Sequence, residues 1–498
     1  MPFTPLLVAF LIQSAPASAD ADTKAWWRTT AILSDDDMQG RDTGTPAHQR
    51  AARIVADRLR AAGLAPAGEA GGWFQRVPIE EIAITKAAIR VGGRRLRFLH
   101  DLYADAAHVP QAITGTIAYR GYCGAAALGD VRGKVVVCHG TRRAGLPSGA
   151  DRTKALAEAG AAAMITIADP GFVVEPPRWP FAYARAMRLA GTPPEPSAPL
   201  PNLTLNADAL AAVIAGSGHN AGELIQAGSA GAALPAFDTA ARFEARFTLA
   251  NRTLASSNVV GMLPGTDPAR AGEAIVLTAH LDGYGYGTPV RGDGLYNGTL
   301  DDAAYVALIV RLMERRAGKG YRRPIIVAIV TGEEKGLLGS SWLIAHPPVP
   351  LDRIAGNINL DQLRPIFPLE LLTVHALGDT SLGDDAHAVA TSLGIAVQND
   401  PEPERNLIRR SDQWNFIKAG IPATNFVFGY RPGTTSERIY RRWYVEGYHK
   451  PQDDLAQAID WKAATDFNRF FYALVERVAD QATAPAWKPG SKLRPSKP

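Results

Sequence analysis

Three apolar segments in the second half of the chain each end at residues that bind metals or carry protons. The segments, with the residues that follow them, are 274–279 with His280, 323–330 with Glu333 and Glu334, and 355–360 with Asp361. They predict strands, and a helical pattern over residues 303–315 indicates a largely parallel sheet flanked by helices. Because ligands of such sheets gather at the carboxyl ends of the strands, we expect these side chains to meet at one edge.

Three more polar residues nearly complete a ligand set for two metal ions. They are Asp282 in A-H-L-D-G, Asp301 in L-D-D-A-A and His449 in G-Y-H-K-P. Histidine nitrogens and carboxylate oxygens are zinc ligands, and a catalytic zinc keeps one position open for water. Each motif alone is more often structural, so the prediction of a two-zinc hydrolase site rests on their joint occurrence in order along the chain.

The candidate residues divide by chemical role. We expect the zinc ligands to be His280, Asp301, Glu334, Asp361 and His449. Asp301 would bridge the ions, with His280 and Asp361 on one, and Glu334 and His449 on the other. Three carboxylates against four positive charges leave a residual charge that favours a metal-bridging hydroxide as nucleophile.

Three further side chains have expected roles around that nucleophile. Glu333 cannot point the same way as its neighbour Glu334 and is the candidate general base. Asp282 stands two residues from His280, where its carboxylate would hold the imidazole. Tyr448 is the candidate donor to the developing oxyanion.

Composition and charge exclude some other classes. The chain has 498 residues, enough for two domains, and 46% of them are hydrophobic. A formal net charge of +4, mixed along the chain, does not favour a nucleic-acid partner. No internal apolar run has the length of a membrane span. Residues 1–19 predict a cleaved signal peptide, so we expect a secreted or periplasmic protein.

A change in the predicted secondary structure along the chain indicates an inserted domain. We expect the first part of the main domain over residues 20–98, with a helix that begins at Thr45-Pro46 and ends before Gly63. Residues 99–239, with short strands and many turns, predict an inserted β-rich domain. The main domain resumes over 240–485, and 486–498 predicts a disordered tail. Within the insertion, Cys123 and Cys138 are either a disulfide or two buried thiols.

At these residues the chain resembles the co-catalytic zinc aminopeptidases of the clan that also contains glutamate carboxypeptidase and the transferrin receptor. The matching segments are H280-L-D, T299-L-D-D-A-A, T331-G-E-E-K-G-L-L-G-S, N359-L-D, R410-S-D-Q-W-N-F and Y448-H-K-P-Q-D-D, with an amino-terminal part in L33-S-D-D-D-M-Q-G-R-D-T-G-T. The resemblance implies zinc ligation by the five residues above, Glu333 as base and Asp301 rather than Asp302 as bridge. The segments G133-K-V-V-V and A157-E-A-G-A-A-A-M-I resemble a protease-associated domain inserted in the peptidase domain.

These observations favour an exported zinc aminopeptidase acting on peptides. The main alternative is a carboxypeptidase or dipeptidase of the same clan, in which Arg409 and Arg410 would hold a substrate carboxylate. A glutaminyl cyclase is a third possibility, disfavoured by the inserted domain. A catalytically dead binding module is disfavoured because neither a ligand nor the base is missing. Side-chain preference and oligomeric state do not follow from the sequence.

Overall fold

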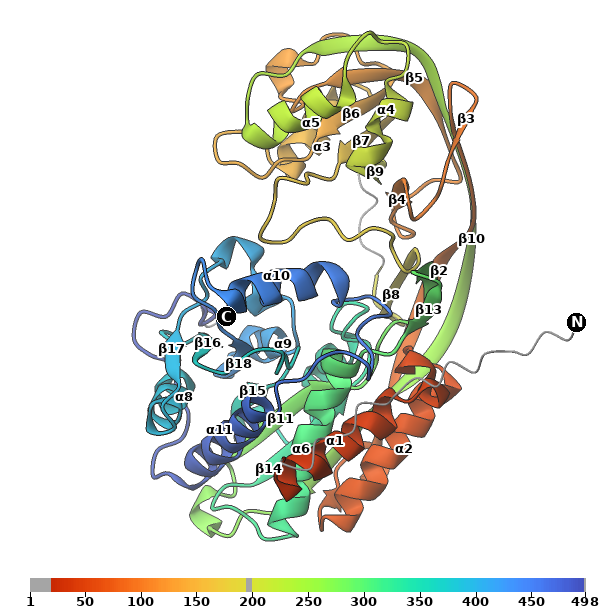
Figure 1. Cartoon of the computed structure of the whole chain (residues 1–498). Coiled ribbons are helices and arrows are strands. Elements are labelled where there is room, and N and C mark those ends of the chain that lie inside the picture. Colours follow the sequence, from red (N-terminus) through yellow and green to blue (C-terminus); the bar gives the residue numbers. More distant parts are fainter. Residues whose placement is uncertain (1–18, 194–198, 497–498) are drawn as a thin grey trace, which may run out of the picture. The chain divides into compact units, whose positions relative to one another are not determined.

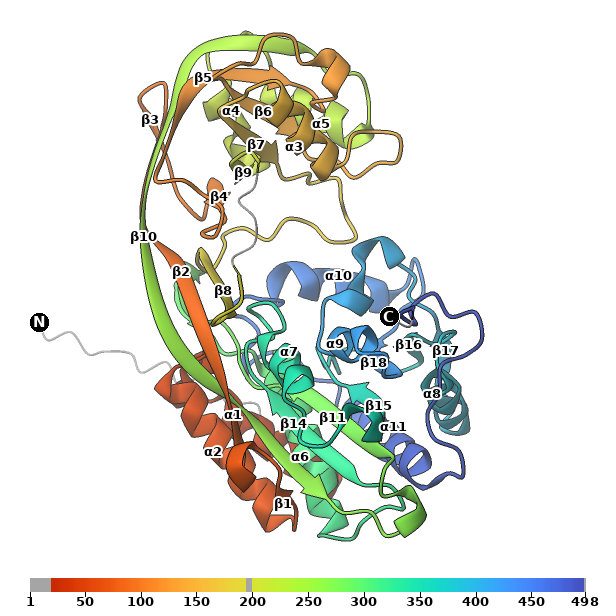
Figure 2. The ribbon, with the colours of Figure 1, turned by 180° about the vertical axis from the view of Figure 1, so that it is seen from behind.

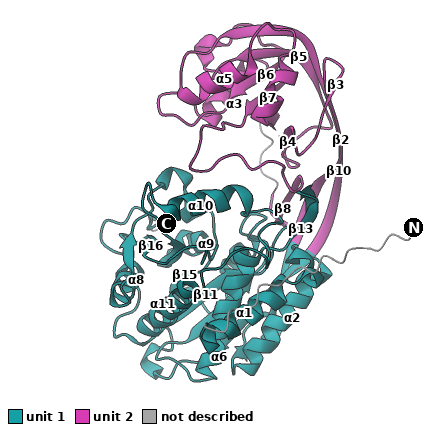
Figure 3. Ribbon diagram, in the orientation of Figure 1, with its two compact units in different colours: residues 1–78, 255–498 teal, residues 79–254 magenta. Residues whose placement is uncertain are grey.

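The computed structural model describes residues 19–193 and 199–496, which form two compact units. The first unit comprises the described residues of Met1–Pro78 and Ala255–Pro498, and the second comprises those of Ile79–Leu254 (Figure 3). The second unit is therefore wider at both ends than the insertion expected over residues 99–239.

The first unit contains a mixed, largely parallel sheet, as predicted. In spatial order its strands are β17 (Ala396–Gln398), β16 (Leu371–His375), β18 (Ala423–Phe428), β15 (Ile354–Asn359), β11 (Ala274–His280), β14 (Ile325–Val330) and β10 (Ala236–Leu263). The four strands from β18 to β14 are parallel neighbours. Strand β16 runs antiparallel to β18 and parallel to β17, and β10 runs antiparallel to β14. The predicted boundaries of β11, β14 and β15 differ from these by one or two residues.

Both faces of this sheet are covered, which explains why its central strands are apolar throughout. One face packs against α1 (Ala21–Ser34), α2 (Pro46–Ala61), α6 (Ala304–Arg316), α8 (Ser381–Ser392), α10 (Thr435–Glu446) and α11 (Trp461–Asp480). The other packs against α7 (Leu338–Ala345) and α9 (Gln413–Lys418). Alternate residues of one strand serve the two cores: Leu277 of β11 lies in the first and Val276 in the second. The helices that cover the sheet can be followed in Figure 1 and, from behind, in Figure 2.

The helix predicted after Thr45 is α2. The Thr45 side chain accepts a hydrogen bond from the backbone N–H of His48, and Pro46 occupies the first turn. Its face with Val55 and Leu59 is fully buried, and Gly63 follows with a φ of 88°. Helix α1 was not predicted from the sequence. Its Trp26 is fully buried and donates a hydrogen bond to the backbone carbonyl of Ala304.

The second unit has a hydrophobic core of its own. Its elements are β3 (Arg94–Leu96), β4 (Leu102–Ala104), β5 (Ala112–Arg120), β6 (Val135–His139), β7 (Ala163–Ile167), β8 (Arg185–Leu189), β9 (Asn202–Leu205), α3 (Gly149–Glu158), α4 (Leu210–Val213) and α5 (Ala221–Ala230). Strands β5, β6, β7 and β9 are parallel neighbours. Two strands, β2 (Phe74–Val91) and β10, continue from one unit to the other.

Cys123 and Cys138 form a disulfide in the second unit, which resolves the choice left open by the sequence. Cys123 lies in the turn after β5 and Cys138 in β6, and both side chains are fully buried. The bond fastens this turn to the adjacent strand.

The predictions for the two ends of the chain compare differently with the structure. Residues 1–18 of the predicted signal peptide lie outside the described residues. The carboxyl-terminal segment is a correction: residues 486–496 are held by contacts and are not a disordered tail. Trp487 donates from its indole to the carbonyl of Gly420, and Lys488 reaches the Asp384 carboxylate. Among the described residues, no helix has the length and apolar character needed to cross a membrane.

Replacing both cysteines by serine should destabilise the second unit. Closing a loop with a sequence separation of 15 contributes about 3 kcal/mol by the chain-entropy model. Urea unfolding of the whole protein, followed by hydrogen exchange in β5 and β6, should show that loss. The parent protein in a reducing agent is the control and should match the variant. Equal stability of the oxidised parent and the variant would contradict the account.

Candidate metal centre

The polar residues that follow β11, β14 and β15 meet at one edge of the first unit's sheet. His280 is the last residue of β11, and β11 lies between β14 and β15, parallel to both. Glu333 and Glu334 follow β14, and Asp361 follows β15. Parallel strands place all of these residues at the same edge, as the sequence predicts.

Asp301 and His449 join this edge from two other places in the chain. Asp301 lies in the irregular turn Thr299–Ala303 that precedes α6, and His449 follows α10. Together with the strand-end residues they form groups that could hold a metal, two of which share Asp301: His280 with Asp301 and Asp361, and Asp301 with Glu334 and His449. A third group is His280 with Glu333 and Glu334.

The two oxygens of Asp301 face different histidines. Its Oδ1 lies 3.1 Å from His280 Nε2, and its Oδ2 lies 3.3 Å from His449 Nε2. On the first side, Asp361 Oδ1 is 3.7 Å from His280 Nε2. On the second side, Glu334 Oε2 is 3.2 Å from His449 Nε2. This is the arrangement of a carboxylate shared between two ions.

The spacing and chemistry of these atoms fit zinc. Ligands about 2.0–2.2 Å from a tetrahedral zinc ion lie about 3.3–3.6 Å from one another, close to the separations above. Asp361 Oδ1 is buried and makes no hydrogen bond within the part of the chain that the structure describes. A buried carboxylate oxygen left in this way is costly unless a cation is bound.

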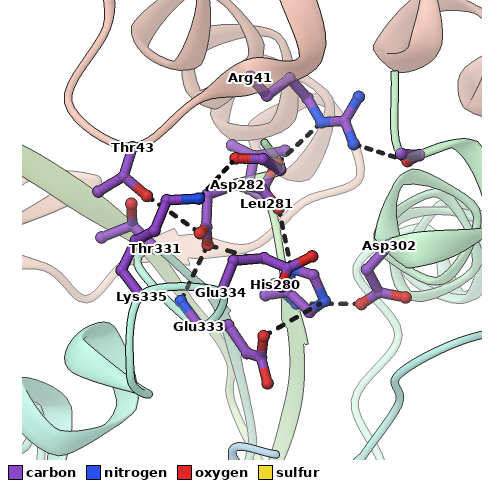
Figure 4. Close-up of polar contacts among 12 residues, drawn as sticks. Arg41, Thr43, His280, Leu281, Asp282, Asp302, Thr331, Glu333, Glu334 and Lys335 are labelled. Atoms are coloured by element: carbon purple, nitrogen blue, oxygen red, sulfur yellow. Dashed lines mark hydrogen bonds and ion pairs between the residues drawn. The ribbon is translucent and has the colours of Figure 1, made fainter. Parts of the chain in front are cut away.

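The neighbouring aspartate has a different task. Asp302 Oδ2 accepts a hydrogen bond of 3.1 Å from the backbone N–H of His280 (Figure 4). Its side chain is fully buried. Asp302 therefore fixes the backbone of the His280 segment, whereas Asp301 faces both imidazoles.

Crowding of carboxylates changes the proton affinities in the site. Burial, reinforced by Asp361 and Glu334, raises the pKa of Glu333 well above its usual value. Burial opposes protonation of His280, but Glu333 and Asp302 nevertheless raise its pKa well above the usual value. Burial also opposes ionisation of Asp301, yet its contacts with His280 and His449 hold its pKa below the usual range. Without a metal, His280 and Glu333 therefore hold protons more tightly than usual, and Asp301 holds one less tightly.

Asp282 departs from its expected contact. His280 Nδ1 lies 2.9 Å from the backbone carbonyl oxygen of Asp282, whereas the Asp282 carboxylate is 4.0 Å away. That carboxylate accepts instead from the hydroxyl of Thr43 at 3.0 Å and from the backbone N–H of Glu333 at 3.1 Å (Figure 4). Asp282 thus holds Glu333, and its backbone, not its side chain, orients His280.

Sequence reasoning missed two further supports of the site. The phenol oxygen of Tyr284 lies 2.8 Å from His449 Nδ1, which fixes the ring whose other nitrogen faces Asp301 and Glu334. Asp453, fully buried, accepts hydrogen bonds from the backbone N–H groups of Leu300 and Asp301 at 2.9 and 3.0 Å. Asp453 lies in the segment Y448-H-K-P-Q-D-D, which was singled out in the sequence, but its contact with the Asp301 turn was not predicted.

Arg41 ties the ligand segments together from the amino-terminal part of the chain. Its guanidinium, fully buried, donates to four backbone carbonyls, those of Leu33, Leu281, Asn297 and Gly298, at 2.6–2.8 Å. Figure 4 shows Arg41 beside Leu281. Leu281 follows His280, and Gly298 lies three residues before Asp301. Burial lowers the pKa of Arg41 to about 10, so the side chain stays charged at neutral pH.

Tyr448 lies beside the site. Its side chain is buried, its ring centroid is 3.7 Å from that of His449, and its phenol oxygen accepts a hydrogen bond of 2.9 Å from Gln362. The alternative substrate anchors differ: the side chains of Arg409 and Arg410 are exposed, and the Arg409 guanidinium lies over the ring of Trp414.

Comparisons with known proteins agree with this geometry. Residues 258–475 match the model of peptidase family M28. No curated protein matches the sequence.

Several solved structures share the fold over nearly the whole chain. An aminopeptidase from Aneurinibacillus sp. strain AM-1 has 18% identity and a TM-score of 0.62, covering 93% of this chain and 95% of its own. A zinc aminopeptidase from Bacillus subtilis has 18% identity and a TM-score of 0.61, covering 93% and 96%. A peptidase M28 precursor from Shewanella amazonensis has 15% identity and a TM-score of 0.55, covering 96% and 99%.

The shared fold confirms the predicted fold class. The family match over residues 258–475 supports the predicted peptidase. The assignment of the second unit as a protease-associated domain stays a prediction.

Zinc binding to the metal-free protein should release protons. Burial and acidic neighbours raise the pKa of Glu333, and acidic neighbours raise that of His280 against the effect of burial, so both groups hold protons more tightly than usual. Metal ligation requires His280 to be neutral. Calorimetric titration at pH 7 in two buffers of different ionisation enthalpy should give release of about one proton or more per chain. Zinc affinity should rise with pH. A binding enthalpy that is independent of the buffer would contradict this expectation.

Replacing Arg41 by methionine should weaken zinc binding. The ligand segments lose four hydrogen bonds to backbone carbonyls, and disturbing groups that orient metal ligands typically costs about 10- to 100-fold in affinity. Competition with a chromophoric chelator measures the change. Arg53→Met, at an exposed position on α2, is the matched control and should leave affinity unchanged. Equal zinc affinity in the Arg41 variant and its parent would show that these four hydrogen bonds are not needed for zinc binding.

Proposed function

We propose that the protein is an aminopeptidase that uses two zinc ions to hydrolyse the amino-terminal bond of peptides, which the match of residues 258–475 to peptidase family M28 supports. The observation that carries the proposal is the position of Asp301, whose two oxygens contact His280 and His449 in two overlapping ligand groups. The proposed ligands of one ion are His280 and Asp361, and those of the other are Glu334 and His449, with Asp301 shared.

The bound zinc would supply Lewis acidity that polarises a water molecule and lowers its pKa towards neutrality. Glu333 accepts the proton of that water and passes it to the leaving amine. Its high proton affinity, which results from burial and the acidic residues around it, suits a group that must hold a proton between these two steps. Asp282 keeps Glu333 in place through the hydrogen bond to its backbone N–H.

Two tyrosines complete the proposed chemistry. Tyr284 orients the imidazole of His449 through the contact at Nδ1. Tyr448, next to His449, donates its phenol proton to the carbonyl oxygen of the scissile bond as negative charge develops there.

The charge of the site favours an amino terminus over a carboxyl terminus as the bound end of the substrate. Glu333 adds a carboxyl group beyond the proposed ligands, and in its ionised form this group attracts an ammonium group and repels a carboxylate. The arginines that a carboxypeptidase would need, Arg409 and Arg410, are exposed at the surface. The solved structures that resemble nearly the whole chain include proteins named as aminopeptidases, which supports the same choice.

We also propose that the protein acts in an oxidising compartment outside the cytoplasm. The disulfide of the second unit is typical of such compartments and agrees with the expected signal peptide. Detection of the protein in the culture medium or periplasm, without residues 1–19, tests this proposal, and retention of the whole chain in the cytoplasm contradicts it.

A panel of aminoacyl-nitroanilides and peptides tests the proposed activity. The zinc-loaded protein should release amino-terminal residues from free peptides and should not act on the same peptides with an acetylated amino terminus. Cleavage of the acetylated peptides from their carboxyl end would instead indicate a carboxypeptidase. Lack of cleavage of every substrate would contradict the proposal.

Replacing Glu333 by glutamine should reduce kcat by about 100-fold or more, because general base catalysis typically contributes 10²–10⁴-fold. Zinc content, measured by mass spectrometry of the metal, should be unchanged, since Glu333 is not a proposed ligand. Glu476→Gln, at an exposed position on α11, is the matched control. Retained turnover in the Glu333 variant would refute its role as the base.

A further inference from the structure

Gln362, directly after Asp361, has a strained backbone and a side chain between two other residues. Its φ is 62°, in the left-handed region that residues other than glycine rarely occupy. Such strain is kept where the surrounding structure requires it, and often at functional sites. The Gln362 amide contacts the guanidinium of Arg364 on one side and the phenol of Tyr448 on the other.

Arg364 is held rigidly in the core. Its side chain is fully buried, and its guanidinium carbon lies 4.6–4.8 Å from the ring centroids of Tyr440, Trp443 and Tyr444 on α10. Cations stack favourably on aromatic rings, more so when they are removed from water. Its Nη2 donates a hydrogen bond to Gln362 Oε1.

The donor character of arginine fixes the orientation of the Gln362 amide. A guanidinium only donates, so the amide must turn its oxygen towards Arg364. Gln362 Nε2 then donates to the phenol oxygen of Tyr448, at 2.9 Å. The phenol oxygen acts as acceptor in this contact, and its own proton is directed away from Gln362.

We propose that Arg364 and Gln362 are positioning residues that set the direction in which the Tyr448 phenol donates its proton. The inference rests on the proposed function, in which Tyr448 donates to the substrate carbonyl oxygen. Without the amide donor, the phenol can donate to position 362 instead of to the substrate. Gln362 follows Asp361 directly, so the same segment supplies a proposed metal ligand and the group that orients the oxyanion donor.

The decisive variant is Gln362→Glu. The glutamate keeps the shape of the side chain and pairs with Arg364, but its carboxylate only accepts hydrogen bonds, so it captures the phenol proton. We expect kcat to fall about 10- to 100-fold with KM little changed. This is less than the about 10²–10³-fold cost of losing an oxyanion donor outright, because the phenol is misdirected but still present. Gln49→Glu, at an exposed position on α2, is the matched control and should behave as the parent.

A double-mutant cycle separates positioning from a merely structural role. In a Tyr448→Phe background, which lacks the phenol, Gln362→Glu should change kcat by less than about twofold, since coupled residues are not additive. Additive losses, a KM effect without a kcat effect or a lower zinc content would overturn the proposal. If Gln362→Glu does not fold, Gln362→Met takes its place in the same cycle.

A second measurement keeps failure of this inference distinct from failure of the proposed function. Calorimetry with a dipeptide phosphonate, which imitates the tetrahedral state, should show weaker binding to Gln362→Glu, whereas binding of the free amino acid product should be unchanged. Equal losses for both compounds would overturn the inference and leave the aminopeptidase intact. A parent protein that neither cleaves peptides nor binds the phosphonate would overturn the proposed function, and the inference with it.

Discussion

Repulsion between buried carboxylates is the constraint on which the candidate site depends. Asp301, Asp302, Glu333 and Asp361 lie at the same edge of the first unit's sheet and are nearly inaccessible to solvent. Charges buried in this way are stable only when they are paired with cations or carry protons. The two ligand groups that share Asp301 have the separations that metal ions require. Without a metal, Glu333 and His280 bind protons more tightly than usual, which reduces the repulsion.

The fold meets this constraint by fixing the backbone around each ligand before a metal arrives. Parallel pairing of β11 with β14 and β15 sets three of the ligand segments. Arg41 joins the His280 segment to the turn before Asp301 through backbone carbonyls, and Asp453 holds the same turn through backbone N–H groups. These supports act on the backbone, so the ligand side chains remain available for the metal. A site prepared in this way loses little entropy when the ions bind.

The sequence predicted the parts of the site that follow from local pattern. Apolar runs followed by His280 or Asp361 predict strand ends, and parallel pairing then brings the ends together. Contacts between distant segments were beyond this reasoning: nothing local to Tyr284 indicates that it meets His449, 165 residues away. Asp282 was placed near His280 correctly, but its carboxylate turned to Glu333 because the backbone carbonyl already serves the imidazole. The prediction of a disordered tail was wrong because it relied on the many lysines and prolines of the segment, whereas Trp487 is held by a hydrogen bond to the distant Gly420.

The central claim is that Asp301 is shared by two metal ions. Diffraction from zinc-loaded crystals, recorded on both sides of the zinc absorption edge, locates each ion without reference to activity. The account predicts two anomalous peaks about 3.5–4 Å apart, one beside each oxygen of Asp301 and within bonding distance of His280 and His449 respectively. A single peak, or two peaks that do not flank Asp301, would contradict it.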